Sequence, residues 1–426
     1  MRGHRIGRAG LAGTSAAILL GLGTGCGGGG IGLGHNTIAT PADNVAEVAV
    51  DFGLPDIFYL NGLFATATVC VPGTSDCQDI DHLLVDTGSS GLRVLSSVLT
   101  LTLPTVTDAG GGVLSECGQF VSGFIWGTLA TADVKLAGEQ ASDITVQIID
   151  ERAYPVPSDC TGVGANTAET LGANGILGIG SFLYDCGAEC AAPVGGTRSS
   201  NPGTYYACSS RMVGGCQATA VPLSKQVANP VGLFSQDNNG TIIELPAIPA
   251  YGTPGVAGAL VFGIGTRENN GLNHATVIQL SSWSGTFLSS YPPSGSPSIA
   301  FVDSGSNGIY FLDSVSTKIP TCSAPIAHFY CPGSTLNLSA RNQDNNGRFG
   351  VTVNFSIANA RALLSNQNNF AFDNVGGPSV EPSAGSGSAN MSSYFDWGLP
   401  FYFGRNVFTA LEGRSTPAGV GPFVAF

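Results

Sequence analysis

Two stretches of the sequence each place an aspartate at the end of an apolar run and follow it with small hydroxylated residues. The first runs from Leu84 to Leu95 and contains Asp86-Thr87-Gly88-Ser89, and the second runs from Phe301 to Leu312 and contains Asp303-Ser304-Gly305-Ser306. The offset between the copies is constant (303 − 86 = 217). A repeat of such a long period implies two similar structural units, each with a strand, a carboxyl group at its end and a tight turn.

Two carboxyl groups that fold together have a definite chemical use. Like charges a few ångströms apart cannot both ionise, so Asp86 and Asp303 would share one proton. The ionised group removes a proton from water while the protonated group polarises a carbonyl. Gly88 and Gly305 allow the tight turns. The neighbouring hydroxyl groups, which can orient the carboxyls, belong to Thr87, Ser89, Ser304 and Ser306.

Other interpretations of these residues are weaker. The two aspartates could merely cap turns in a repeated β fold, but the long matched context favours a dyad. We find no Gly-x-Ser-x-Gly elbow, which disfavours a serine hydrolase. We interpret His82 as structural, and Trp126, Trp283 and Trp397 as core residues.

The two motifs resemble those of the pepsin-like aspartic peptidases, and the resemblance covers most of the chain. In that family each aspartate is paired with a downstream apolar-apolar-glycine segment. Ile176-Leu177-Gly178 fits after Asp86, and Tyr402-Phe403-Gly404 fits after Asp303, at similar gaps (178 − 86 = 92; 404 − 303 = 101). Leu233-Phe234-Ser235 and Leu260-Val261-Phe262-Gly263 are similar to the strands that join the family's two lobes. The chain is also similar to a group of bacterial lipoproteins that share these motifs.

The resemblance implies an all-β, bilobal fold with the dyad in a central cleft. It also implies an endopeptidase that acts on peptides or proteins, without a cofactor or metal, and we expect a monomer. Gly178 and Gly404 would support the catalytic Asp86 and Asp303.

Three departures from the family pattern support an alternative. Arg93 stands where the family has a tryptophan, and the flap region from Glu116 to Phe120 has no tyrosine. Arg405 replaces an acidic residue, and a cation near the cleft would lower carboxyl pKa values. The alternative is a catalytically silent relative that binds peptides or proteins in its cleft; a surface-anchored structural module is a third, weaker hypothesis.

Composition agrees with a β-rich chain. Charged residues make up 11%, whereas the 426 residues include 61 Gly and 24 Pro. The formal net charge of −13 argues against nucleic acid as a partner. A pattern typical of a helix occurs only from Ile357 to Leu364. Asp344-Asn345-Asn346-Gly347 is similar to part of a calcium loop, but Val353 stands where the closing Glu would be, so we predict a hairpin turn.

The amino terminus is typical of an export signal. Arg2, Arg5 and Arg8 precede the short apolar run Leu11–Leu22. Small residues then lead to Cys26, which predicts a lipoprotein-type signal over 1–25 and a lipid anchor on Cys26. Gly23 departs from the usual aliphatic residue, and ordinary signal cleavage nearby is the alternative. Gly27 after Cys26 suggests an outer-membrane location in the bacterial cell envelope, with the periplasm or cell surface also open.

The cysteine count supports export. Setting Cys26 aside from the 11 cysteines leaves ten, an even number that suggests disulfides. Close neighbours that could each close a loop are Cys70/Cys77, Cys208/Cys216 and Cys322/Cys331. No Cys or His set has compact zinc-ligand spacing. We therefore expect a Gly-rich tether over 26–45, an N-terminal β lobe over 46–266 and a C-terminal β lobe over 267–426.

Overall fold

Two large β-sheets make up most of the computed structural model, which describes residues 37–121, 123–195, 201–379 and 394–426. Alternating apolar residues and abundant Val, Ile, Thr and aromatic side chains favour strands in these segments. In the described residues the first sheet has 15 strands, in the order β10 (Cys216–Ala218), β9 (Tyr205–Cys208), β5 (Val113–Phe120), β6 (Gly123–Leu136), β7 (Glu139–Ile149), β4 (Ser90–Leu95), β8 (Gly175–Ile179), β3 (Cys77–Asp86), β2 (Leu63–Cys70), β1 (Val45–Val50), β12 (Val256–Phe262), β11 (Gly240–Leu245), β21 (Arg405–Ala410), β24 (Phe423–Ala425) and β13 (Val277–Gln279).

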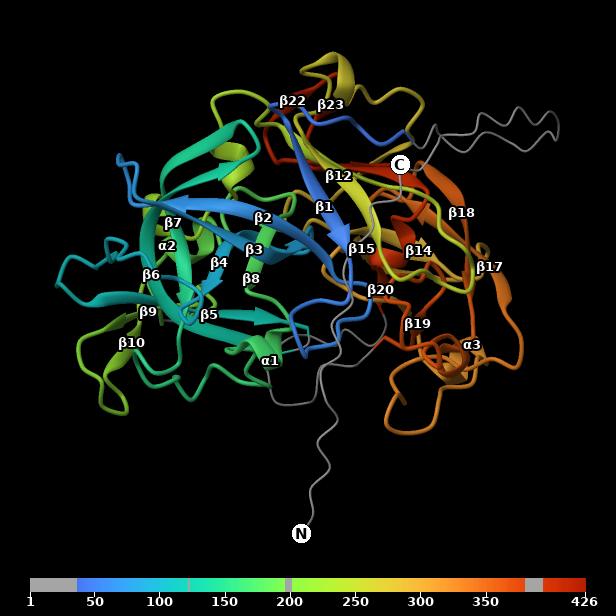
Figure 1. Cartoon of the computed structure of the whole chain (residues 1–426), viewed down its shortest axis with the longest axis horizontal. Coiled ribbons are helices and arrows are strands. Elements are labelled where there is room, and N and C mark those ends of the chain that lie inside the picture. The colour runs from blue at the N-terminus through green and yellow to red at the C-terminus, as the bar shows by residue number, and fades with distance from the viewer. Residues whose placement is uncertain (1–36, 122, 196–200, 380–393) are drawn as a thin grey trace, which may run out of the picture. The chain divides into compact units, whose positions relative to one another are not determined.

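The second sheet has seven strands in the described residues, all from the later part of the chain. Their order is β18 (Gly350–Ile357), β17 (Leu336–Gln343), β14 (Phe287–Ser290), β15 (Pro297–Val302), β20 (Tyr394–Trp397), β16 (Ile309–Phe311) and β19 (Gly376–Gly377). A small ribbon pairs β22 (Ser415–Thr416) with β23 (Gly419–Val420). Figure 1 shows β2 to β10 gathered on one side and β14 to β20 on the other. The expected all-β fold with two β lobes is confirmed.

Helices are short in the described residues. They are α1 (Ala168–Leu171), α2 (Ala188–Ala191), α3 (Ser314–Thr317) and α4 (Ala360–Leu363), with 3-10 turns η1 (Leu223–Lys225), η2 (Pro230–Leu233), η3 (Glu268–Asn270) and η4 (Leu399–Phe401). The predicted helix over 357–364 is therefore reduced to α4, because Ile357 still belongs to β18. No helix among the described residues is long and apolar enough to cross a membrane.

We predicted two strands that join the lobes. One of the two segments is a strand, and the other is not. Leu260–Phe262 lies in β12, which pairs with β1 and β11. Leu233 instead ends η2, because Asn229 caps a 3-10 turn that Pro230 begins. The strand that follows is β11, which pairs with β21 from the end of the chain.

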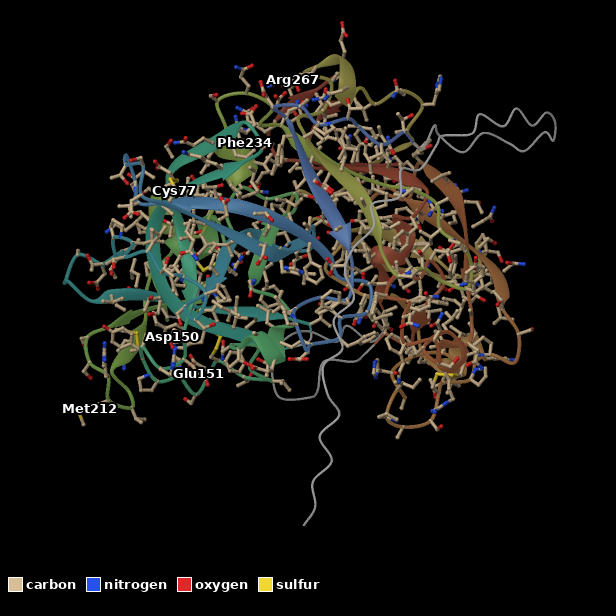
Figure 2. All side chains as sticks on the ribbon, viewed as in Figure 1. Cys77, Asp150, Glu151, Met212, Phe234 and Arg267 are labelled. Atoms are coloured by element: carbon tan, nitrogen blue, oxygen red, sulfur yellow. A yellow bond between two sulfur atoms is a disulfide. The ribbon has the colours of Figure 1, made fainter. Side chains whose placement is uncertain are left out.

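Several smaller predictions are confirmed. The predicted hairpin joins β17 to β18 through the turn at Asp344–Gly347. The three close cysteine pairs are disulfides, and two further bonds join Cys117 to Cys160 and Cys186 to Cys190. Figure 2 places Cys77 at one edge of the first lobe, away from the second sheet. The predicted signal over 1–25 and Cys26 lie outside the described residues.

Aromatic side chains fill the core of the second sheet. Phe395 stacks on Phe311 and on Trp397, with ring centroids 5.0 and 4.4 Å apart. Trp126 and Trp397 are fully buried, as expected, but Trp283 is 76% exposed, so its assignment to the core is wrong. Because aromatic burial dominates core energetics, this cluster holds β20 firmly beside β16.

Candidate active site

The same arrangement of three strands presents each aspartate. In the first lobe β8 lies between β3 and β4, parallel to β3 and antiparallel to β4. In the second lobe β20 lies between β15 and β16 with the same directions. Asp86 ends β3 and Asp303 follows β15 directly, so each carboxyl group sits where its strand gives way to a turn. The sequence repeat is therefore a structural repeat.

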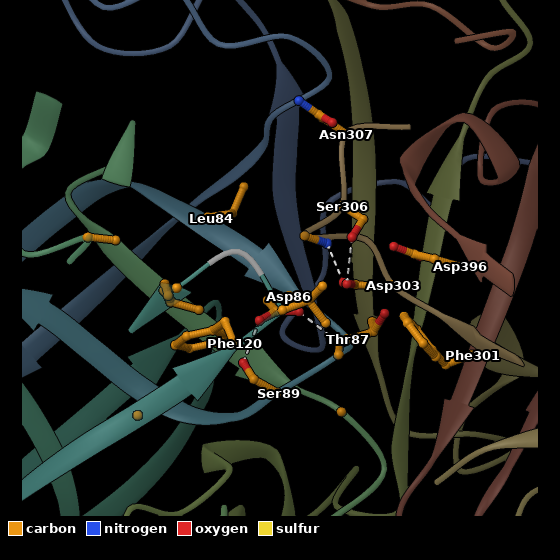
Figure 3. A pocket seen from close by; sticks show the side chains of 18 of the residues that line it. Leu84, Asp86, Thr87, Ser89, Phe120, Phe301, Asp303, Ser306, Asn307 and Asp396 are labelled. Atoms are coloured by element: carbon orange, nitrogen blue, oxygen red, sulfur yellow. Dashed lines mark hydrogen bonds between the residues drawn. The ribbon is translucent and has the colours of Figure 1, made fainter. Parts of the chain in front are cut away.

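The two repeats bring the carboxyl groups of Asp86 and Asp303 face to face (Figure 3). A Cβ atom added to Gly88 would lie 2.9 Å from the carboxyl carbon of Asp303. A Cβ atom added to Gly305 would lie 2.9 Å from Oδ1 of Asp86. Glycine is therefore required at both turns, because any side chain there would occupy the space of the opposite carboxyl group.

Each carboxyl group is oriented by its own turn in the same way. The N–H of Gly88 and the hydroxyl of Ser89 donate to Oδ1 and Oδ2 of Asp86, at 2.7 and 2.5 Å. The N–H of Gly305 and the hydroxyl of Ser306 donate to Oδ1 and Oδ2 of Asp303, both at 2.8 Å. The four donors fix both carboxyl planes, as expected from the sequence.

Thr87 and Ser304 connect the two turns to each other. The N–H of Thr87 donates to the hydroxyl of Ser304 at 3.1 Å, and the N–H of Ser304 donates to the hydroxyl of Thr87 at 3.0 Å. The hydroxyls in turn donate to the carbonyls at Val302 and Val85 of the opposite strands. Both residues are buried. These four bonds hold the two aspartates in a fixed relation, because each turn supplies the partners of the other.

The electrostatic surroundings favour one proton on the pair. Burial, the nearby charge of Asp86 and a direct interaction with the Asp86 carboxyl raise the pKa of Asp303 from 3.8 to about 8. Hydrogen bonds from Ser306 and Gly305 act in the opposite direction. A pair that holds one proton avoids two like charges in contact.

The prediction of the glycine that supports each turn is confirmed in the first lobe and is wrong in the second. Gly178 pairs with Asp86 in register, and a Cβ atom there would lie 2.8 Å from the Ser89 hydroxyl. Gly404 instead lies beside Ala247, outside the cleft. Gly398 takes the equivalent place, since a Cβ atom on it would meet the carbonyl oxygens of Gly308 and Ser306 at 2.1 and 2.7 Å.

A cleft of about 1240 Å³ opens over the dyad. The β5–β6 hairpin reaches over it, with Phe120 at the end of β5 lying near Asp86 (Figure 3). Phe120 thus occupies the flap where the resemblance implies a tyrosine. Tyr59 also lines the cleft, and its pKa is raised by burial and by the charges of both aspartates.

Arg93 forms a buried charge cluster at one end of the cleft. Its guanidinium donates to Glu116 at 2.8 Å and lies 3.5 Å from Asp185. The side chains of Arg93 and Glu116 are 3% and 1% exposed. Burial and the nearby Glu116 raise the pKa of Asp185 well above its ordinary value. Glu116 therefore neutralises the cation that replaces the family's tryptophan.

Arg405 does not act on the dyad, contrary to our expectation. It donates to the carbonyl of Phe401 at 2.6 Å, and its guanidinium lies 4.6 Å from the Phe401 ring centroid. Its charge affects Asp373 rather than either cleft aspartate. The reason is that Gly398, and not Gly404, lies beside the second turn, which leaves Arg405 at the start of β21.

Sequence reasoning missed three residues of this site. Tyr402, expected only as part of the segment Tyr402-Phe403-Gly404, places its hydroxyl 2.8 Å from that of Thr87. Tyr59 comes from the loop after β1, and no pattern marks it. Asp396 lies beside Ser306 and Asp303 (Figure 3). The sequence spacing contained a signal for Asp396. The gap from Asp303 to Gly398 (398 − 303 = 95) is closer to the gap of 92 in the first lobe than the gap of 101 to Gly404 is.

The fold and the site define an all-β, two-lobed protein with a pair of carboxyl groups in its cleft. The chain belongs to the family described as protein of unknown function (DUF3443), whose model matches residues 40–426. A search of curated proteins found no match. Among solved structures, the crystal structure of an aspartic proteinase from Irpex lacteus is similar, with 15% identity and a TM-score of 0.49 over 89% of this chain and 96% of that chain.

Proposed function

We propose that the protein is an aspartic endopeptidase in which Asp86 and Asp303 activate one water molecule against a peptide bond. The observation that carries the proposal is the mutual approach of the two carboxyl groups, each oriented by two donors of its own turn. A pair that holds one proton contains both a base and an acid, as peptide hydrolysis requires.

The chemistry follows from these protonation states. Ionised Asp86 takes a proton from the water, whose oxygen attacks the peptide carbonyl carbon. Neutral Asp303 donates its proton to the carbonyl oxygen, and a tetrahedral diol forms. Proton transfer to the amide nitrogen then breaks the C–N bond, and an amine and a carboxylic acid leave. The reaction needs no cofactor, because the pair both accepts and supplies protons.

The location of the protein is part of the proposal. Five disulfides among the described residues fit an oxidising compartment outside the cytoplasm. Together with the basic and apolar amino terminus they favour export, and Cys26 is the residue we propose to carry a lipid anchor. Mass spectrometry of the mature protein tests the anchor, since only a lipidated Cys26 adds acyl mass to the amino-terminal peptide.

A second candidate function is peptide binding without cleavage. Phe120 and the Arg93 cluster favour it, because they replace the flap tyrosine and the tryptophan that the resemblance implies. The cleft would then hold a peptide without aligning it for attack.

Cleavage of a denatured protein across an acid pH series separates the two candidates. The wild type should cut, whereas Asp86→Ala and Asp303→Asn should not. Asp79→Asn is the matched control, because Asp79 lies on the same strand but its carboxylate is exposed and accepts from the Thr68 hydroxyl. Equal cutting by all four proteins would assign the activity to a contaminant, and no cutting by the folded wild type would favour binding alone.

A further inference from the structure

A buried acid breaks the symmetry of the two lobes next to the dyad. In the first lobe Ile176 pairs with Leu84 on one side and with Arg93 on the other. In the second lobe Asp396 pairs with Phe301 and with Tyr310, which stand at the equivalent positions of the repeat. Asp396 therefore occupies the place of Ile176, and a carboxyl group replaces an aliphatic side chain.

The surroundings of Asp396 disfavour a negative charge. The residue is 4% exposed, and its Oδ1 has no hydrogen-bond partner in the part of the chain that the structure describes. No ion pair to it occurs among those residues. The titratable groups that face it are acids and phenols, namely Asp303, Asp86, Tyr310 and Tyr402, with Tyr394 nearby on the same strand.

Burial and the acidic neighbours act on the pKa of Asp396 in one direction, and the Ser306 hydroxyl acts in the other. Burial, together with the charges of Asp303 and Asp86, raises the pKa of Asp396 well above its ordinary value. A buried carboxyl group without a cation stays neutral, because the neutral form avoids the free-energy cost of desolvating a charge.

The Ser306 hydroxyl connects Asp396 to the dyad. It donates to Oδ2 of Asp303 at 2.8 Å, and it also interacts with the side chain of Asp396. Figure 3 shows the Asp396 carboxyl pointing toward Ser306 and Asp303. A hydroxyl group has one proton to donate. Because Asp303 receives that proton, a hydrogen bond between the Ser306 hydroxyl and Asp396 would need a proton from Asp396.

We propose that Asp396 is a positioning residue that stays protonated and donates to the Ser306 hydroxyl, which then donates more strongly to Asp303. Hydrogen bonds in a chain polarise one another, so the extra donor stabilises the ionised form of Asp303. The first lobe has Ile176 at this place, and Asp86 therefore has no such chain. The inference rests on the proposed function, because adjusting the pKa of Asp303 has a purpose only in a catalytic pair. The protonation of Asp396 is measurable without any turnover.

The test is an NMR titration that follows the carboxyl carbons of the full-length protein labelled with ¹³C-aspartate. It compares the wild type with Asp396→Asn, which keeps a donor, and with Asp396→Ile, which copies the first lobe. If Asp396 is a neutral donor, the Asp396→Asn variant leaves the apparent pKa of Asp303 unchanged. A neutral donor also predicts that Asp396→Ile raises that pKa by roughly half to one unit, the share that one donor adds to a charge-assisted hydrogen bond.

Other outcomes overturn the proposal in distinct ways. An ionised Asp396 would repel charge on Asp303, so both variants would lower the pKa of Asp303. A merely structural Asp396 would leave that pKa unchanged in a folded Asp396→Ile variant. Should this variant not fold, the wild-type signal of Asp396 decides, because ionisation below about pH 5 contradicts the proposal. A chain that cleaves no peptide gives the same titration, so the two proposals fail separately.

Discussion

The N–H group of Thr87 donates to the hydroxyl of Ser304, and the N–H group of Ser304 donates to the hydroxyl of Thr87. The two residues are 217 positions apart, the same offset as the two aspartates. One exchange of hydrogen bonds therefore joins the two copies of the repeat directly beneath the dyad. It converts two similar turns into a single site.

Removing either hydroxyl should destabilise the fold. Thr87→Val and Ser304→Ala each leave a buried N–H without its acceptor, which costs about 1–3 kcal/mol. Guanidinium denaturation measures the loss. Thr74→Val is the control, because the Thr74 hydroxyl bonds at an exposed turn and its removal should cost about 0.5 kcal/mol or less. If Thr87→Val and Ser304→Ala were as stable as the control, the hydrogen bonds between Thr87 and Ser304 would not hold the lobes together.

Asp303 should make stability depend on pH. Its pKa is raised in the folded protein, from 3.8 to about 8, so the folded state holds a proton that the unfolded state has released between these values. This contribution to stability is full below pH 3.8 and is lost as the pH rises through about 8. Asp303→Asn removes the charge, and we expect it to gain about 1–2 kcal/mol over the wild type at pH 7.

Denaturation of both proteins at pH 3.5 and pH 7 tests the sign. The difference between wild type and Asp303→Asn should nearly vanish at the lower pH, where Asp303 is neutral in both states. If Asp303→Asn gained more stability over the wild type at pH 3.5 than at pH 7, the result would contradict a raised pKa of Asp303.

Arg93 should be essential for stability, although it lies at the edge of the cleft. Arg93→Ala leaves Glu116 and Asp185 buried without their cation, and breaking such a pair costs about 3–5 kcal/mol. Arg152 is the matched control, because it is 79% exposed and pairs with Asp150 at the surface. Thermal unfolding should show a large loss for Arg93→Ala and almost none for Arg152→Ala. A similar small loss in both would show that the buried cluster is replaceable.

Phe120 should help to hold a substrate without taking part in the chemistry. Phe120→Ala removes apolar surface from the flap, and we expect kcat/KM to fall about tenfold through a higher KM. Val121 is the neighbouring control, because it is 59% exposed at the tip of the same hairpin. Steady-state kinetics on a peptide substrate separate the effects. A fall in kcat alone for Phe120→Ala would instead assign Phe120 a role in the transition state.

Much of the site could be predicted because it is local in sequence. Asp86, Asp303 and their hydroxyl neighbours lie within two short motifs, and a motif repeated at one offset must fold twice in the same way. Gly178 was expected from the family resemblance, which pairs each aspartate with a downstream apolar-apolar-glycine segment. The partners of Arg93 could not be predicted, because Glu116 and Asp185 come from segments whose pairing depends on the complete sheet.

Gly404 was a wrong prediction with a clear physical cause. Tyr402 and Phe403 match an apolar-apolar-glycine pattern, whereas the true segment, Asp396-Trp397-Gly398, carries an acid at its first position. A pattern of hydrophobicity cannot anticipate a buried carboxyl group whose partners lie elsewhere in the chain. The register of β20 beside β15 reveals it at once.

The most direct test of the central claim is kcat/KM for peptide cleavage by Asp86→Asn, Asp303→Asn and the double variant. Two carboxyl groups that act as one unit predict that each single change lowers kcat/KM by about a thousandfold or more, and that the double change lowers it no further. Single variants that retain activity within about tenfold of the wild type, or two losses that multiply in the double variant, would contradict a shared-proton dyad.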